Sequence, residues 1–493
     1  MNNNRALFLA SFMTLIAAGV GFAVRGAILN DWASEFGFTK AELGTITGGG
    51  LVGFGVVILI CSLFADQLGY KPVLVLAFLL HLLSALITLA ATPIYESMDP
   101  VAGKKAVYWC LYVGMFMFAV GNGLCEGVIN PLVATLYPKQ KTHYLNILHA
   151  GWPGGLIVGG LFAYAFCGPG AQVTHLRWEI PMMFFLVPTL YYGFIVLKEK
   201  FPLSEAKAAG VSFGTMLREF ASPILLLLLV LHAMVGYVEL GTDSWITNIM
   251  ENVIPGQAIL LFVYTSGLMF ALRFFAGPIV ERINPVGLLL LSSILGALGL
   301  FYLGHANTGY AVLAAATIYG VGKTFLWPTM LGVVGERFPR GGALTMGAIG
   351  GAGALSAGLL GGPGIGYKQD YYASAKLREV SPPAYEQYVS EEKKSFLMLP
   401  EISGLDGSKV GQLLAKPADE MTEEDLANVG PIKEANLYGG RMALQWTALV
   451  PAIMAIGYLI LLLYFKSRGG YKAETIHQHL DQLKHPEDLA TPP

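Results

Sequence analysis

The sequence reads Gly277-Pro-Ile-Val-Glu281-Arg282-Ile-Asn284-Pro285 directly after its eighth apolar stretch. The segment after the second stretch reads Ser62-Leu-Phe-Ala-Asp66-Gln67-Leu-Gly69-Tyr70-Lys71, with the same order of small residue, three spacers, acid and tight turn. The small residue lets a neighbouring helix approach closely, and Gly or Asn tolerates a left-handed backbone at the turn. The acid can lie against a helix N-terminus. Recurrence of the pattern six stretches later predicts two six-helix halves.

The composition is that of a membrane protein. Apolar residues make up 54% of the 493 residues, charged residues only 13%, and the mean hydropathy is +0.57. A soluble protein would carry roughly 25% charged residues. Because lipid offers no partners for free backbone groups, spans of this length must be helices. We therefore predict an all-α polytopic membrane protein with about twelve spans, near residues 6–29, 43–65, 72–93, 106–136, 145–167, 179–198, 222–250, 258–280, 285–305, 309–335, 341–363 and 442–466.

These spans divide the chain into predicted domains. They are an N-terminal half (1–198), a polar linker (199–221), a C-terminal half (222–466) and a tail (467–493). Both termini are expected on the cytoplasmic side, because Lys and Arg concentrate in short cytoplasmic loops. The loops on that side would hold Lys71, Lys139, Lys141, Lys198, Lys200, Lys207, Arg218, Arg282, Arg337, Arg340, Lys466 and Arg468. The opposite short loops hold only Lys40, Lys104, Lys105 and Arg177.

Residues 364–441 form a long insertion between the last two spans, on the outer side. It is far longer than an ordinary connection between helices. A short helix is expected to start near Thr422, because Glu423, Glu424 and Asp425 follow it. The insertion is interpreted as an extracytoplasmic cap or a disordered segment, with a substrate-binding lid or a partner-docking element as the alternative.

Four ionisable residues lie deep in separate spans: Arg25, Glu126, Glu239 and Lys323. Charges at this depth cost a few kcal/mol each on insertion scales. Their presence predicts a polar pathway inside the helical bundle. No metal-ligand cluster, cofactor motif, nucleophile–base spacing or nucleic-acid-binding basic cluster accompanies them, so an enzyme is not predicted.

The block Glu126-Gly-Val-Ile-Asn130-Pro131-Leu-Val133, followed by Asn146 and His149, is the most specific motif. Further matches are Arg273 within 272–277 and Trp327-Pro328-Thr329. With these residues the chain resembles the major facilitator superfamily, and within it the branch of fucose–proton symporters and related sugar transporters. The resemblance covers all the spans but not 364–441.

The resemblance implies that spans 1, 4, 7 and 10 line a central cavity, and the four buried charges fall on these spans. It further implies that Arg25 faces Glu126 in one half and Glu239 faces Lys323 in the other. Two features depart from the family. The family's span-1 acid is missing from Ala23-Val24-Arg25-Gly26-Ala27, and Lys323 stands where the family has a small neutral residue. Both changes add positive charge to the predicted cavity.

The sequence leaves two interpretations open for each of Glu126, Arg25 and Lys323. Glu126 is either a proton-coupling carboxylate or a structural partner of Arg25. Arg25 could bind a substrate carboxylate bidentately or only neutralise Glu126. Lys323 either contacts the solute or pairs with Glu239.

The roles of the other candidate residues are likewise open to two interpretations. His149 occupies a position where the family has a sugar-contacting amide, or it is a packing residue. His232 has only its placement on span 7 in its favour. The predicted substrate contacts are Arg25, Asn122, Asn130, Asn146, His149, Trp152, Glu239, Lys323 and Trp327, although the Asn side chains could bond helix to helix and the Trp rings could simply pack. The predicted conformational lock comprises Asp66, Gly69, Arg273, Gly277, Glu281 and Arg282.

The sequence thus favours a secondary active transporter for a sugar or sugar-like solute, working by alternating access and coupled to H+. The first alternative is a carrier or exchanger of an anionic solute such as a sugar acid. A non-transporting membrane sensor or scaffold is the alternative from another class. We expect a monomer in the cytoplasmic (inner) membrane, with no cofactor.

Overall fold

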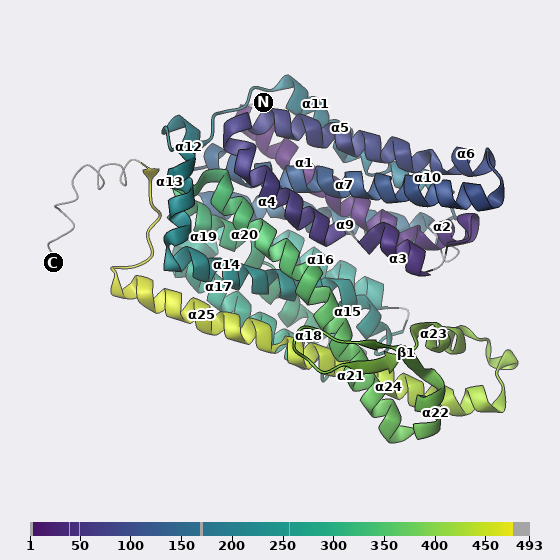
Figure 1. Cartoon of the computed structure of the whole chain (residues 1–493). Helices are drawn as coiled ribbons and strands as arrows, with labels where there is room; N and C mark the ends of the chain where they lie inside the picture. The colour runs from purple at the N-terminus through teal and green to yellow at the C-terminus, as the bar shows by residue number, and fades with distance from the viewer. Residues whose placement is uncertain (1–2, 39, 49, 168–170, 256, 477–493) are drawn as a thin grey trace.

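A computed structural model describes residues 3–38, 40–48, 50–167, 171–255 and 257–476. Two layers of long helices lie side by side, one from each half of the chain (Figure 1). The N-terminus, the linker and the end of the last helix lie together at one end, which we call the terminal face. Residues 364–441 lie at the opposite end, the insertion face, toward which the two layers diverge.

The described residues contain ten helices long and apolar enough to cross a membrane. The predicted eighth span is represented by a shorter apolar helix, α16, and the tenth by two consecutive helices, α18 and α19. The first layer consists of α1 (Asn3–Ala27), α2 (Leu29–Phe36), α3 (Lys40–Gly48), α4 (Gly50–Leu68), α5 (Tyr70–Leu89), α6 (Ala91–Glu96), α7 (Pro100–Leu136), α8 (Lys141–His149), α9 (Gly151–Phe166), α10 (Glu179–Met183) and α11 (Leu186–Lys198).

Three short elements connect the layers: α12 (Glu205–Ala208), α13 (Phe213–Arg218) and η1 (Glu219–Ala221). The second layer consists of α14 (Pro223–Gly236), η2 (Tyr237–Gly241), α15 (Thr242–Glu251), α16 (Ala258–Arg273), α17 (Ala276–Leu303), α18 (Gly309–Lys323), α19 (Leu326–Arg337), η3 (Pro339–Gly341), α20 (Gly342–Ser356), η4 (Ala357–Gly361) and α25 (Leu449–Ser467). The elements η2 and η4 are π-helical turns that meet each other.

The two repeated turns have the expected backbone. Gly69 has φ +86° and Asn284 has φ +55°, so both lie in the left-handed region that the motif predicted. Asn284 interrupts α17, and the chain reverses there before Pro285 opens the next span. The boundary predicted between spans 8 and 9 is therefore a real break in the helix.

The insertion is folded, which excludes its interpretation as a disordered segment. The helix of span 11 continues as α21 (Gly362–Val380), and α24 (Glu423–Thr447) packs against it and leads into α25. Between them lie α22 (Pro382–Tyr388), the antiparallel strands β1 (Val389–Lys394) and β2 (Ile402–Leu405), α23 (Gly407–Ala415) and η5 (Ala418–Glu420).

The helix predicted to start near Thr422 does begin there, with a capping box between Thr422 and Asp425, but it is 25 residues long and not short. The insertion also has a hydrophobic core of its own, which includes Leu377, Tyr388, Leu413 and Ile432. The predicted boundaries at 364 and 441 therefore fall inside helices that extend the last two spans.

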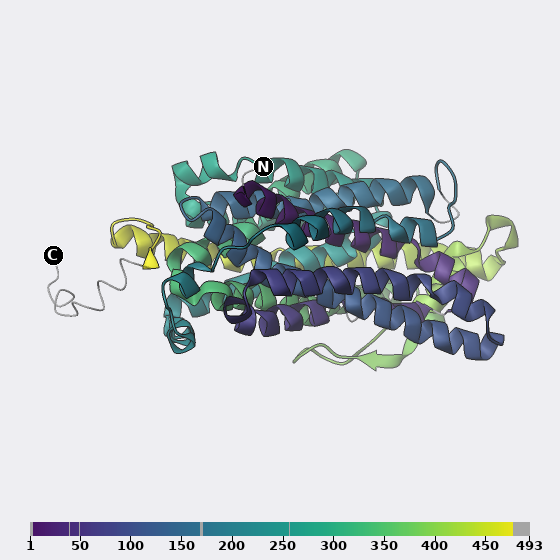
Figure 2. The same cartoon turned by 90° about the horizontal axis from the view of Figure 1, so that it is seen from above.

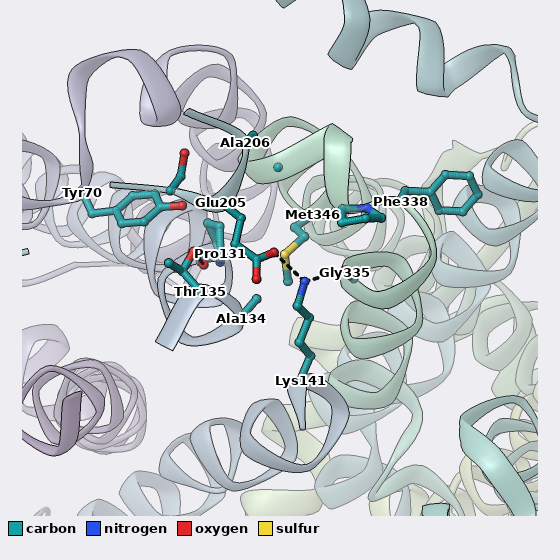
Figure 3. A pocket seen from close by; sticks show the side chains of 13 residues that line it. Tyr70, Pro131, Ala134, Thr135, Lys141, Glu205, Ala206, Gly335, Phe338 and Met346 are labelled. Atoms are coloured by element: carbon teal, nitrogen blue, oxygen red, sulfur yellow. Dashed lines mark hydrogen bonds and ion pairs between the residues drawn. The ribbon is translucent and has the colours of Figure 1, made fainter. Parts of the chain in front are cut away.

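The two layers are joined at the terminal face. Asp66 Oδ2 accepts a hydrogen bond of 2.9 Å from the backbone N–H of Ala343, at the start of α20. Lys141 donates to Glu205 of the linker (2.6 Å) and to the Gly335 carbonyl (3.1 Å). Figure 3 shows Lys141 and Glu205 in a pocket between the layers that Tyr70, Gly335 and Met346 also line. The structure is therefore closed at this face.

Asp66 and Glu281, the acids of the two repeated motifs, differ in their burial and in their contacts at the terminal face. Asp66 is buried and caps a helix of the other layer, whereas Glu281 and Arg282 are exposed. In the second motif the contact to the other layer comes instead from the Gly277 N–H, which donates to His143 Nδ1 (3.1 Å). Asp66 therefore forms a hydrogen bond across the terminal face in this conformation.

Replacing Asp66 with Ala should shift the protein toward conformations open at the terminal face. A lost N-terminal cap costs about 1 kcal/mol, so the open fraction should rise roughly five- to tenfold. The measurement is the rate at which a maleimide labels Ala134→Cys, which lines the pocket of Figure 3. Asp66→Asn retains an acceptor and should change the rate less, and Glu281→Gln is the matched control. An unchanged rate in Asp66→Ala would remove Asp66 from the lock.

Candidate functional site

Glu126 lies at the centre of the candidate site, on α7. Its carboxylate is buried, and it accepts a hydrogen bond of 3.1 Å from Asn130 Nδ2, one helical turn further along. His149, at the end of α8, places Nε2 2.9 Å from Asn130 Oδ1 and 3.6 Å from Glu126 Oε1. Because Asn130 Oδ1 can only accept, His149 Nε2 carries a proton. The carboxylate therefore has an amide and an imidazole as its partners from its own half.

The second half of the chain completes this site through Trp327 on α19. This side chain lies beside the Glu126 carboxylate. The ring packs against His232 of α14, with 4.6 Å between the ring centroids. Neither ring nitrogen of His232 has a hydrogen-bonding partner in the structure, although the side chain is fully buried. Glu126 thus lies where helices of the two halves meet.

Arg273 connects the Glu126 cluster to the acids of the other half. From the end of α16 its guanidinium donates to the carbonyl of His149 (2.6 Å), to the carbonyl of Thr324 (2.8 Å) and to Glu239 Oε1 (3.1 Å). Five N–H groups in a planar fork allow one side chain to bond three acceptors at once. Arg273 therefore ties Glu239 to the backbone of the opposite half.

A second ion pair lies beyond Glu239. Lys323 Nζ is 2.5 Å from Asp243 Oδ1 and 5.1 Å from the centre of the Tyr319 ring. Glu239 and Asp243 are four residues apart, so they lie on one side of the helix through η2 and α15. Arg273 and Lys323 are thereby each paired with an acid.

The ionisable groups form a chain of alternating charge across the two halves. It runs from Glu126 and His149 through Arg273 and Glu239 to Lys323 and Asp243. With His149 uncharged, three carboxylates face two cations, and the chain carries a net charge of −1. An uncompensated charge at this depth is costly. One proton on the Glu126–His149 pair brings the chain to neutrality.

Arg25 does not face Glu126, which corrects the predicted pairing. Its guanidinium lies between the rings of Phe118 (3.6 Å) and Phe185 (4.5 Å), and Nη2 donates to Ser84 (3.2 Å). Phe118 precedes Glu126 by eight residues, about 12 Å along the helix. These contacts of Arg25 all come from its own half. They place Arg25 closer to the insertion face than Glu126 is.

The predicted pairing of Glu239 with Lys323 is also wrong. Glu239 pairs with Arg273, and Lys323 pairs with Asp243. The sequence placed Glu239 and Lys323 on facing helices but could not give the rotation of each helix about its axis. One turn of span 7 separates Glu239 from Asp243, and this turn decides which acid meets the lysine.

The other predicted contacts fall into two groups. Asn146 Nδ2 donates to Thr329 Oγ1 of the other half (3.1 Å), and its Oδ1 has no hydrogen-bonding partner among the described residues, so it lies near the site. Asn122 instead contacts His81 Nε2 (3.1 Å), and Trp152 packs on Phe22 (5.7 Å between centroids). These two residues belong to the packing of the first layer.

The sequence also contained signals for residues that were not predicted as site residues. Thr329 belongs to the Trp-Pro-Thr motif and bonds the predicted contact Asn146. Asp243 lies one turn from Glu239, a spacing that makes it an equal candidate for the lysine. His232 is an isolated polar residue in an apolar helix, and only its placement against Trp327 marks it.

Comparisons with known proteins give similarities along most of the chain. The model of the family described as Major Facilitator Superfamily matches residues 6–362. The L-fucose-proton symporter of Escherichia coli (strain K12) is 23% identical over 398 residues, covering 72% of this chain and 85% of the symporter.

Solved structures of transporters share the fold. The proton:xylose symporter XylE, bound to 6-bromo-6-deoxy-D-glucose, aligns with a TM-score of 0.64 at 14% identity, over 92% of this chain and 94% of XylE. A bacterial homologue of the human lysosomal transporter Spinster, inward-facing and unoccupied, aligns with a TM-score of 0.62 at 16% identity, over 93% of this chain and 97% of the homologue. The arrangement of spans in this chain is therefore that of known transporters.

Proposed function

Because this chain belongs to the major facilitator superfamily, a family of multi-pass membrane transporters, we propose that it is a secondary active transporter that moves a sugar or sugar-like solute together with a proton. It works by alternating access, with both termini on the cytoplasmic side of the inner membrane, and as a monomer. The similarity to the L-fucose-proton symporter supports both the solute class and the coupling ion.

The position of Glu126 is the observation that carries this proposal. The carboxylate lies at the junction of the two halves, and the ion pairs around it leave a deficit of one positive charge. A proton on Glu126 removes this deficit, which makes the protonated site the state best suited to crossing between conformations. The missing acid of span 1 is then no obstacle, since a single carboxylate is sufficient to bind the proton.

Solute binding is assigned to the polar groups that surround this carboxylate. Asn130, Asn146 and His149 offer donors and acceptors for hydroxyl groups, and Trp327 offers an aromatic face for sugar C–H groups. These residues come from α7, α8 and α19, so a bound solute would bridge the two halves. Movement of one half against the other then opens the site to one face at a time.

The contacts of the two basic residues give less support to the carrier of an anionic solute. Lys323 is paired with Asp243, and Arg25 is separated from the Glu126 cluster. A sensor or scaffold would not need ionisable residues at all, and these residues are costly at this depth. Proton-coupled transport is therefore the function that accounts for most of the buried charges.

Uptake into proteoliposomes, with and without an inward pH gradient, tests the proposal. The probes are L-fucose, D-xylose, D-glucose and D-glucuronate. We expect a neutral sugar to accumulate only with the gradient, by up to about tenfold per pH unit at a coupling of one proton to one sugar. Gradient-independent uptake of D-glucuronate would overturn the proton-coupled proposal in favour of the anion carrier. Transport of none of the probes would contradict the sugar class.

A further inference from the structure

The tip of the β1–β2 hairpin is an exposed apolar surface that the transport function does not use. Ser395-Phe-Leu-Met-Leu-Pro400 contains no charged residue and lies between Lys394 and Glu401. Leu397 is 73%, Met398 100% and Leu399 45% exposed. Three consecutive exposed apolar side chains at the end of a projecting hairpin are unusual on a surface that faces water.

The hairpin lies along the flank of the helical bundle. In both views its tip points back from the insertion face toward the terminal face (Figures 1 and 2). The Tyr367 hydroxyl donates to the Pro400 carbonyl (2.7 Å), and the Phe396 ring lies against Gly364, where an added Cβ would come within 2.9 Å of it. The tip is therefore fixed to α21 near Gly364.

The depth of Gly364 follows from the length of the helix that carries it. α20 starts at Gly342 on the terminal face, and its helix continues through η4 into α21. The 22 residues to Gly364 rise about 33 Å, and the hydrocarbon core of a bilayer is about 30 Å thick. Gly364 is thus at the level where this helix leaves the bilayer on the insertion side.

The surroundings of the tip are those of a membrane boundary. Tyr367, Tyr371 and Phe396 form a group of neighbouring rings, as is usual where proteins meet lipid headgroups. Leu359, 54% exposed on the preceding turn, continues the apolar surface toward the centre of the bilayer. Lys393 and Lys394 precede the tip and pair with Glu401 (3.6 Å) and Asp370 (3.4 Å), and long basic side chains at this level can also reach the headgroups.

The backbone conformation of the turn also supports contact of the tip with lipid. Leu397 has φ +52°, a left-handed conformation that favours Gly or Asn and is strained for leucine. Transfer of the leucine side chain from water into an apolar phase is favourable and offsets this strain. We propose that residues 396–399 insert into the outer leaflet of the bilayer and anchor the folded insertion to the lipid surface. This inference is independent of the proposed solute and proton.

The test is the depth of a nitroxide spin label at Met398→Cys, in a variant whose cysteines at 61, 110, 125 and 167 are replaced by alanine. The protein is reconstituted in phosphatidylethanolamine/phosphatidylglycerol liposomes. Power saturation compares accessibility to O2, which concentrates in lipid, with accessibility to nickel ethylenediaminediacetate, which stays in water. We expect position 398 to resemble Leu359→Cys, with O2 accessibility higher than nickel accessibility. Glu424→Cys, exposed on the insertion, should give the reverse order.

Each other result would overturn the proposal. High accessibility to both reagents would place the tip in water, and low accessibility to both would indicate a protein partner or a second copy of the chain. A second measurement uses trypsin cleavage after Lys393 and Lys394, which are 65% and 53% exposed. Replacing Leu397, Met398 and Leu399 with serine should speed this cleavage several-fold in liposomes but not in detergent. Equal acceleration in both would mean that the variant loosens the hairpin itself.

Discussion

Replacing Glu126 with Gln should abolish uphill accumulation of the solute while leaving exchange across the membrane intact. Gln is neutral and can still accept the hydrogen bond from Asn130, so it imitates the protonated carboxylate. The chain of ion pairs is then permanently balanced, and the halves can exchange conformations with solute bound. With a gradient of one pH unit, accumulation should fall from about tenfold to none. The measurements are gradient-driven uptake and counterflow in the same proteoliposomes.

The controls separate coupling from folding. Glu281→Gln neutralises an exposed acid of the terminal face and should change neither measurement. Glu126→Asp keeps an ionisable group and should retain gradient dependence at a reduced rate. If Glu126→Gln still accumulates solute, the proton does not bind there. If it also loses counterflow while remaining folded, Glu126 is a solute contact and not the coupling site.

Replacing Arg273 with Met should have the second large effect, on stability as well as on transport. The substitution leaves the Glu239 carboxylate buried without its cation and removes the bonds to the carbonyls of His149 and Thr324. Breaking one side of a buried pair costs about 3–5 kcal/mol. We expect a lower melting temperature in detergent and loss of both uptake and counterflow.

A double variant tests this explanation. Glu239→Gln combined with Arg273→Met removes the uncompensated charge, so it should recover most of the lost thermal stability. Transport should stay impaired, because the link from Arg273 to the His149 backbone is still absent. Full recovery of transport would show that Arg273 only neutralises Glu239. A single Arg273→Met variant with unchanged melting would mean that the guanidinium is not needed to hold the halves together.

Local patterns in the sequence were sufficient to predict the class of protein and much of its architecture. The patterns that allowed this are local ones: the apolar spans, the two turns ending in Gly69 and Asn284, and the block from Glu126 to Val133. Each follows from a local requirement of the backbone or of the bilayer. Asp66 at a helix N-terminus could be predicted in the same way, because the motif fixes both the acid and the turn beside it. The family resemblance and the similarity of the solved transporters agree with these patterns.

The pairing of the buried charges, in contrast, depends on how the helices pack in three dimensions. Glu239 and Asp243 differ by one turn, and Arg25 and Glu126 lie at different depths, so the choice of partner depends on the rotation and offset of each helix against its neighbours. Those quantities arise from side-chain packing between spans far apart in the chain, and no local pattern records them. The same reason applies to the insertion. The start of its last helix at Thr422 could be predicted from the sequence, but the contact of its hairpin tip with α21 forms only when distant segments meet.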